Sequence, residues 1–229
     1  MSQKRLTLIH TSAIMIPVFG ELCAELLPDV EVTHMVDESL LKDIIADKRL
    51  VKSTARRVVG HIISAEQAGA DCIMVTCSSI GPAADLGRQL VDVSVVRVDE
   101  PMAVSAVEAG SRIGVVATLP STLNPTAELI KTQAEKKGKE IDLTKKLCEG
   151  AFEAIITGDG ATHDKIVTAA IRELAEQVDV IALAQASMSR VVDNLPAENK
   201  KIPILSSPRL AVEHLVTLLR ESAKLRRGI

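Results

Sequence analysis

A cysteine followed by two serines, in the sequence Thr76-Cys77-Ser78-Ser79, comes directly after a short apolar run. A run of this kind predicts a buried strand, and the polar residues after it predict a turn into a helix. The field at a helix N-terminus favours a thiolate, so this position is expected to lower the pKa of Cys77. A thiolate there could remove a proton from a substrate or attack it as a nucleophile. The simpler interpretation is a buried cysteine that acts as a small apolar side chain.

Small hydroxyl residues also follow other apolar runs of the chain. Thr11 and Ser12 follow the first run, Thr118 and Thr122 lie after a later one, and Ser187 follows another. Hydroxyl groups and free backbone N–H groups at the start of a helix bind anions, and they also cap helices. Capping would explain one such turn. Several turns of the same composition favour a binding site for a small carboxylate.

The remaining polar candidates have weaker support. His163, which precedes Asp164 in a turn over residues 158–165, is a possible proton donor, although a surface position is the more frequent outcome for such a histidine. His10 ends an apolar run, and we interpret it as a structural histidine with satisfied hydrogen bonds. Asp99 is a charge at a strand end, which usually faces solvent.

The other three cysteines are interpreted as inert, with Cys72 in a strand and Cys23 and Cys148 in helices. No pair of cysteines has the spacing of a zinc site, and no histidine cluster supplies the missing ligands. The chain has no G-x-G-x-x-G after its first apolar run and no Walker loop. Nothing in the sequence therefore predicts a metal or a nucleotide cofactor.

Short apolar runs alternate along the chain with longer segments of 3.6-residue periodicity. Most runs are nearly continuous, which is typical of parallel strands covered on both faces. This alternation predicts βαβ units with right-handed crossovers and therefore an α/β fold with mostly parallel sheets. The predicted strands are 6–10, 30–36, 72–77, 93–98, 113–118, 140–143, 178–185 and 202–206. The predicted helices include 51–68, 166–178 and 210–225, and Gly69, Gly110 and Gly138 are expected to end helices.

The two halves of the chain are related by an internal repeat. Residues 5–11 align with residues 112–118 at an offset of 107, and residues 72–77 align with residues 180–185 at an offset of 108. Matching strand ends in the same order favour a duplication over a chance likeness of two βαβ units. Because ligands of parallel sheets bind at the carboxyl ends of strands, the repeat predicts two similar domains with a shared cleft.

Composition restricts the class of protein further. The 229 residues are 47% hydrophobic and 25% charged, which fits a globular chain and argues against disorder. The formal net charge is −3, and the chain has no Trp or Tyr, so it lacks the basic surplus and stacking aromatics of a nucleic-acid-binding protein. No apolar run approaches the length of a membrane span. Thr11 and Ser12 interrupt an N-terminal run that faintly suggests a signal peptide, so we expect a cytoplasmic protein with reduced thiols.

The chain resembles the aspartate/glutamate racemase superfamily, near its hydantoin-racemase-like branch, over essentially its whole length. The resemblance depends on the duplicated halves and on Val75-Thr76-Cys77-Ser78-Ser79, Thr118 with Thr122, Gly158-Asp159-Gly160 with His163-Asp164, and residues 178–184. It implies two similar parallel-sheet α/β domains related by a pseudo-twofold duplication, with the active site in the cleft between them. The first domain would comprise residues 1–99 and 208–229, and the second residues 100–207.

The resemblance also implies a cofactor-independent enzyme. Family members typically use two cysteines, one from each half, on opposite faces of a substrate's α-carbon. Cys77 matches the first cysteine, whereas Gln185 stands at the position of the second. Glutamine has no titrating proton near neutral pH, so we do not expect a standard two-cysteine racemase. Gln185 could instead orient the intermediate, or it could cap the following helix. The predicted oxygen-binding residues are Thr11, Ser12, Ser78, Ser79, Thr118, Thr122, Ala186 and Ser187.

We therefore predict a cysteine-dependent racemase or isomerase that acts at the α-carbon of a small carboxylate, similar to aspartate, glutamate and hydantoin racemases, with His163 as a possible acid. Two alternatives stay open. One is a decarboxylase or C–C lyase that uses Cys77 alone, and the other is a carboxylate-binding protein without activity. The predicted partner is a small carboxylate, without nucleic acid, membrane, cofactor or metal. We also expect a homo-oligomer.

Overall fold

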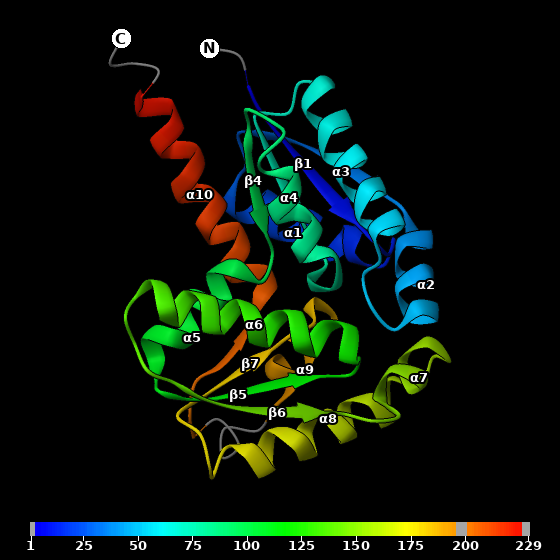
Figure 1. Ribbon diagram of the computed structural model, residues 1–229, viewed down its shortest axis with the longest axis vertical. Helices are drawn as coiled ribbons and strands as arrows, with labels where there is room; N and C mark the ends of the chain where they lie inside the picture. The colour runs from blue at the N-terminus through cyan, green and yellow to red at the C-terminus, as the bar shows by residue number, and fades with distance from the viewer. Residues whose placement is uncertain (1–2, 196–200, 226–229) are drawn as a thin grey trace. The chain divides into compact units, whose positions relative to one another are not determined.

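The computed structural model describes residues 3–195 and 201–225 and divides the chain into two compact units. Unit 1 takes in the chain up to Val98 and the chain from Pro208 onward, and unit 2 runs from Asp99 to Ser207. The outermost residues of the predicted first domain, 1–2 and 226–229, lie outside the described part, as do residues 196–200 of the predicted second domain. Each unit contains a four-stranded parallel sheet with helices on both faces, which confirms the predicted α/β fold (Figure 1).

The sheet of unit 1 has the strand order β2-β1-β3-β4. Its strands are β1 (Lys4–His10), β2 (Val30–Val36), β3 (Cys72–Val75) and β4 (Ser94–Arg97). The helices of the unit are α1 (Met15–Leu26), α2 (Glu38–Asp47), α3 (Lys52–Gln67), η1 (Ser78–Ile80), α4 (Gly81–Gly87) and α10 (Ser207–Leu225). All strand pairs are parallel, so the carboxyl ends of β1 and β3 lie at one edge of the sheet.

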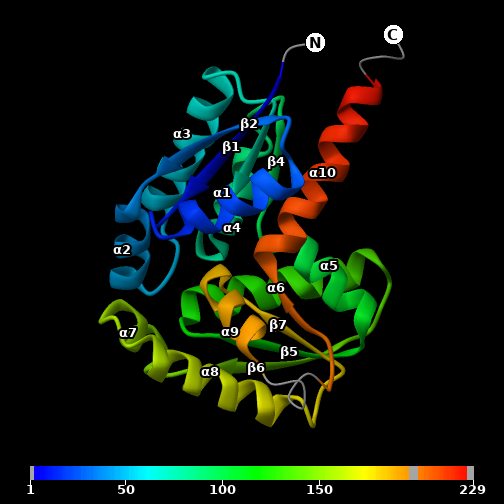
Figure 2. The same ribbon diagram turned by 180° about the vertical axis from the view of Figure 1, so that it is seen from behind.

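Two apolar layers cover the sheet of unit 1, because successive side chains of a strand project to opposite faces. On one face, Leu6 and Leu8 of β1 pack with Phe19 of α1 and Leu215 of α10. On the other face, Ile9 of β1 packs with residues from α2, α3 and α4. Figure 2 shows α2 and α3 on one side of β1 and α10 on the other. β1 therefore alternates strictly between the two layers. This alternation decides which polar residues meet at its end.

The sheet of unit 2 repeats the same topology with the order β6-β5-β7-β8. Its strands are β5 (Arg112–Ala117), β6 (Asp142–Leu147), β7 (Val180–Leu183) and β8 (Ile204–Ser206). Its helices are α5 (Glu100–Ala109), α6 (Pro120–Lys136), α7 (Ala151–Ile156), α8 (Gly160–Leu174), η2 (Ala186–Met188) and α9 (Ser189–Asn194). Val116, Ile181 and Leu183 pack with α7, α8 and α9 in one core layer. The equal strand orders are what the internal repeat predicts.

Most predicted elements are present, and β6 is the clearest difference. β6 runs from Asp142 to Leu147, so the prediction of a strand over residues 140–143 was several residues too early. β6 has only two apolar residues, Leu143 and Leu147, and it lies at the edge of its sheet, so it lacks the continuous apolar run of a central strand. Among the described residues, no helix is both long and apolar enough to cross a membrane.

The predicted helix ends are confirmed, but their conformations differ. Gly69 (φ +88°) and Gly138 (φ +61°) follow α3 and α6 in the left-handed region, which favours glycine. Gly110 ends α5 in an extended conformation instead. The backbone N–H groups of Ser111 and Arg112 donate to the Asp179 carboxylate, which fixes the start of β5 just after this glycine.

Candidate active site

The Cys77 turn lies at the carboxyl edge of the sheet of unit 1. β3 ends at Val75, the N–H of Thr76 donates to the Ile9 carbonyl at 3.0 Å, and Cys77 then precedes the short helix η1. The N–H of Ile80 donates to the Cys77 carbonyl at 3.2 Å, which closes the turn. Cys77 is thus anchored on both sides by backbone hydrogen bonds. Its side chain is partly exposed and packs against the layer of α2, α3 and α4.

Burial and hydrogen bonding act in opposite directions on the Cys77 thiol. Burial raises the pKa of Cys77, while hydrogen bonds from the Thr11 and Ser79 side chains and the Ser79 and Ile80 backbones lower it. The net direction is upward, so the prediction of a lowered pKa was wrong. The helices that follow Cys77 are only three and seven residues long, so their field is weak against the cost of removing a charge from water. At neutral pH this thiol is mainly protonated.

We expect Cys77 to be the first of the four cysteines to react with iodoacetamide near neutral pH. Burial raises the pKa of Cys23 and Cys148 to about 11 and that of Cys72 to about 12, and all three are at most 2% exposed. Only a reachable thiol can be alkylated, so access decides the order. Peptide mass spectrometry after short labelling measures it. Faster labelling of Cys23 or Cys148 would contradict the assignment.

Cys148 is not in a helix, contrary to prediction. It follows β6 directly, and its N–H donates to the Ala117 carbonyl at 2.8 Å. Its side chain lies in the apolar layer that contains Val116 and Val167. The prediction that its thiol is inert is unaffected, because the thiol is buried among aliphatic side chains.

The hydroxyl residues of unit 1 gather around the Cys77 turn. Thr11 is buried, and its side chain hydrogen bonds to Cys77. Ser78 and Ser79 are buried in η1. Ser12, in the turn after Thr11, is partly exposed. None of them is the N-cap of the adjacent helix. The N-cap of α1 is Ile14 and that of η1 is Cys77, without a side-chain cap in either case. Helix capping therefore does not account for these hydroxyl groups.

Gln185 is tied to Thr118 across the ends of β7 and β5 in unit 2. The Gln185 Oε1 atom accepts from the Thr118 N–H at 2.6 Å and from the Thr118 hydroxyl at 2.9 Å. A backbone N–H can only donate, so the atom facing it must be the amide oxygen. The side-chain NH₂ group of Gln185 is then directed away from Thr118 and offers two N–H donors. The cap at the start of η2 is not made by this side chain, so the capping interpretation of Gln185 was wrong.

Gln185 occupies in unit 2 the backbone position that Cys77 occupies in unit 1. Each residue precedes a three-residue 3₁₀ helix, with φ −125° and ψ 119° at Cys77 and φ −117° and ψ 133° at Gln185. Each also bonds to the threonine after the first strand of its sheet, Thr11 or Thr118. The two turns have the same backbone conformation and differ in their side chains. The thiol of one turn can carry a proton, and the amide of the other can only donate or accept hydrogen bonds.

The other residues of unit 2 that were predicted to bind substrate oxygens differ in how far they are buried. Thr122 is buried in the first turn of α6, Ala186 is partly exposed, and Ser187 is exposed in η2. Thr118 and Gln185 are joined by two hydrogen bonds.

His163 is buried, with 1% of its surface exposed, so the expectation of a surface histidine was wrong. It lies in the first turns of α8, on the helix face that continues with Val167 and Ile171 into the core. Because α8 returns the chain between two parallel strands, its N-terminal end lies at the carboxyl edge of the sheet, the edge of Thr118 and Gln185. Its Nδ1 atom lies 2.7 Å from Asp164 Oδ1, which also accepts from Arg190.

Sequence reasoning missed two polar clusters near the carboxyl edge of unit 1. Asp37 caps α2, and its carboxylate also binds Arg57 and His61. Burial alone would raise the pKa of Asp37, but hydrogen bonds from Ser39, His61 and Arg57 outweigh it and hold the pKa well below its usual range. The second cluster joins His10 to His34 and Thr76. A histidine at the end of one strand and a threonine at the end of its neighbour were the available clue.

Asp99 is fully buried, which corrects the expectation that it faces solvent. It lies between β4 and α5, two residues after Arg97, which is itself 4% exposed and paired with Asp85 at 2.6 Å. The charges at the end of β4 are thus part of the interior.

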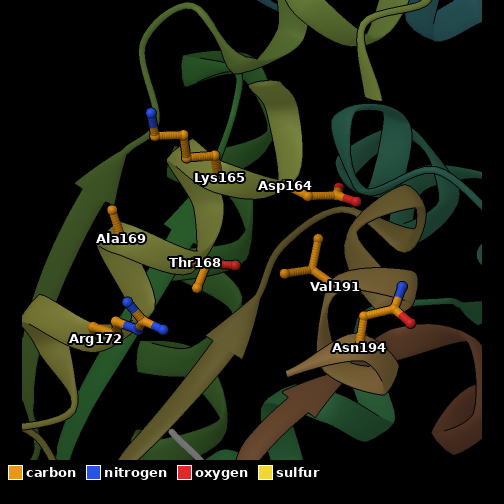
Figure 3. Close-up of a pocket in the computed structure, with 7 residues that line it drawn as sticks. All are labelled: Asp164, Lys165, Thr168, Ala169, Arg172, Val191 and Asn194. Atoms are coloured by element: carbon orange, nitrogen blue, oxygen red, sulfur yellow. The ribbon is translucent and has the colours of Figure 1, made fainter. Parts of the chain in front are cut away.

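A separate hollow of about 460 Å³ lies on unit 2 between α8 and α9 (Figure 3). Its lining residues are Asp164, Lys165, Thr168, Ala169, Arg172, Val191 and Asn194. It contains neither Thr118 nor Gln185. Within the described residues, no group of three or more His, Cys, Asp or Glu side chains is arranged to hold a metal ion.

The family model for Asp/Glu/hydantoin racemases matches residues 8–215, so the chain belongs to this family, as the resemblance predicted. A search of curated proteins gave no match. Solved structures with the same fold include a glutamate racemase from Francisella tularensis in complex with D-glutamate. It has a TM-score of 0.73 and 17% identity, with 97% of this chain and 83% of that chain covered.

Two further structures extend this likeness. An allantoin racemase from Klebsiella pneumoniae has a TM-score of 0.72 and 16% identity, with 96% of this chain and 89% of that chain covered. The aspartate racemase of Picrophilus torridus has a TM-score of 0.68 and 16% identity, with 96% and 92% covered. At these identities the likeness establishes the shared fold. Membership of the family supports an enzyme that acts on small carboxylates.

Proposed function

We propose that the protein is a cofactor-independent enzyme that exchanges the α-proton of a small carboxylate through Cys77. The observation that carries the proposal is the anchored turn at Cys77, a partly exposed residue whose thiol is hydrogen bonded to Thr11 and Ser79. A thiolate at this position takes the α-proton and becomes a thiol, and the electron pair left on carbon is delocalised into the carboxylate as an enediolate. The thiol then exchanges its proton with solvent and delivers a solvent-derived proton to the carbon, which regenerates the thiolate, so atoms and charge balance.

The raised pKa of Cys77 suits this chemistry in a specific way. Few molecules carry the thiolate at neutral pH, but a thiolate with a higher pKa is a stronger base toward a weakly acidic C–H group. The hydrogen bonds from Thr11, Ser79 and Ile80 limit the rise. We expect the rate of proton exchange to increase with pH until the thiol is fully ionised.

The carboxylate and its developing enediolate need hydrogen-bond donors. We assign this role to the hydroxyl and N–H groups of the strand-end turns: Thr11, Ser12, Ser78, Ser79, Thr118, Thr122, Ala186 and Ser187. Such groups stabilise charge that forms during the reaction, without a full positive charge in the site. The NH₂ group of Gln185, directed by the bond of its oxygen to Thr118, orients the intermediate. His163, with Asp164 as its partner, is held in reserve as the second acid for the case in which the wild type inverts its substrate.

A decarboxylase that uses Cys77 alone is the second candidate function. The supporting observation is the raised pKa of Cys77, because a thiol that stays protonated at neutral pH is ready to protonate an enediolate left by loss of carbon dioxide. The oxygen-binding groups would be the same in this reaction. A cytoplasmic location, a homo-oligomer and the absence of a cofactor remain part of the proposal.

We expect deuterium to enter the α-position of an accepted substrate in D₂O with retention of configuration. Cys77 can remove the proton and return a deuteron to the same face, while Gln185 has no proton to deliver at a useful pKa. Proton NMR of L-aspartate, L-glutamate and a 5-substituted hydantoin measures exchange, and chiral chromatography measures inversion. Release of carbon dioxide from a screened dicarboxylate would instead support the decarboxylase. Tight binding without either reaction would leave only a binding protein.

A further inference from the structure

We infer that His10 is a positioning residue for the reactive thiol: through Thr76 it holds Thr11 against Cys77. The inference rests on the proposed function only in taking Cys77 as the reacting group. The geometry is a pair of cross-strand contacts in successive positions. His10 and Thr76 meet on the α1/α10 face of the sheet, and the next residues, Thr11 and Cys77, meet on the opposite face. Because side chains alternate along extended chain, fixing one pair fixes the other.

The hydrogen bonds of His10 define a single arrangement of protons. Thr76 Oγ1 lies 3.0 Å from the Ile9 carbonyl and 2.9 Å from His10 Nδ1. The hydroxyl has one proton, which it donates to the carbonyl, so His10 Nδ1 must carry a proton and donate to Thr76. His10 Nε2 then accepts from His34 Nδ1, at 2.9 Å. All members of this chain are satisfied when His10 is neutral.

The environment of His10 keeps it neutral. It is fully buried, with Phe19 of α1 at 5.8 Å between ring centroids and His34 of β2 stacked at 5.1 Å. Among the described residues, His34 is the titratable group in hydrogen-bond contact with it. Burial and the neighbouring His34 lower the pKa of His10 to about 4. A rigid neutral link between two strand ends is therefore maintained over the pH range in which a thiol titrates.

The second half of the chain supplies an internal control for this inference. At the same positions of the repeat, Ala117 stands for His10 and Ala184 for Thr76, and both alanines are fully buried. The N–H of Ala184 donates to the Val116 carbonyl at 2.9 Å, as that of Thr76 donates to Ile9. The turn of unit 2 thus has the same backbone without the polar link. The fold does not require a His–Thr pair here, and the pair occurs in the half that carries the thiol.

The test is the pH dependence of Cys77 alkylation by iodoacetamide between pH 6.5 and 11, followed by peptide mass spectrometry. It needs no substrate, so its result is independent of whether the proposed activity is correct. Thr76→Ala and His10→Ala, which copy the alanines of unit 2, are expected to raise the midpoint and to slow alkylation at pH 7.5 about 3- to 10-fold. The reason is that Thr11 is no longer held where its hydroxyl stabilises the thiolate.

Three comparisons separate positioning from a merely structural role. Thr76→Ser keeps the hydroxyl and is expected to keep the wild-type midpoint. His214→Ala, which changes an exposed histidine of α10, is expected to have no effect. Thr11→Val should raise the midpoint by itself, and adding Thr76→Ala to it should raise the midpoint no further, because both act through one hydrogen bond. An unchanged midpoint in folded Thr76→Ala, or additive shifts in the double variant, would overturn the inference. If His10→Ala does not fold, the Thr76 variants decide.

Discussion

Replacement of Cys77 by alanine is expected to abolish α-proton exchange, with a loss of at least about 10²–10⁴-fold, the usual contribution of a positioned general base. The hydroxyl groups around Cys77 cannot take over its role as the base. Thr11, Ser78 and Ser79 carry hydroxyl groups that are far too weakly acidic to supply a base at neutral pH. Cys77→Ser, which keeps the shape of the side chain, is expected to be as inactive as Cys77→Ala. The measurement is the initial rate of deuterium incorporation into whichever substrate the screen identifies.

Cys23→Ala is the matched control for this loss. Cys23 is a buried thiol of the same unit, in α1, and its side chain lies in the apolar layer on the α1/α10 face. The Cys23→Ala variant should have a lower free energy of unfolding, because the substitution leaves a small cavity. Its exchange rate per folded molecule should be unchanged. Far-UV circular dichroism and thermal unfolding separate the two effects. Exchange that survives in Cys77→Ala would remove the basis of the proposed mechanism.

The α/β fold could be predicted from the sequence because most strands of both sheets are nearly continuous apolar runs. The repeat then predicted that Cys77 and Gln185 occupy equivalent turns, and their backbone angles agree closely. The edge strand β6 was misplaced, because its mainly polar residues lack that continuous pattern. Cys148 was assigned to a helix for the same reason: the end of β6 could not be located.

The chemistry of the site was harder to predict than its position. A helix start after Cys77 indicated a lowered pKa, but the burial that opposes it depends on packing from α2, α3 and α4, which the local sequence does not contain. The Thr118–Gln185 bond and the His10–Thr76 bond both join strands that are far apart in sequence. Pairing of the strand ends, combined with alternation along each strand, would have predicted both. His163 was misjudged because the buried face of α8 begins earlier than its apolar pattern suggested.

The Gln185→Cys variant is expected to gain racemisation, by about 10²–10⁴-fold over the wild type, on any amino acid or hydantoin that shows one-sided exchange. The backbone at Gln185 already has the conformation that presents Cys77, and Thr118 is placed to bond to the side chain there, as Thr11 does in unit 1. A thiol at residue 185 would supply the titrating proton that the amide lacks. Chiral chromatography of L-aspartate, L-glutamate and a 5-substituted hydantoin measures the inversion.

Gln185→Ser is the control for this gain, because it has a similar small side chain without a thiol, and it should show exchange without inversion. Combining Gln185→Cys with Cys77→Ala should remove the gain, since racemisation needs one group to take the proton and another to deliver it. Efficient racemisation by the wild type that depends on Cys77 would show that a group other than Gln185 delivers the second proton. His163→Asn would then be expected to remove it, because His163 lies at the same sheet edge with Asp164 as its hydrogen-bond partner. Failure of Gln185→Cys to invert any substrate that exchanges, with the variant folded, would show that the two turns do not act on one α-carbon.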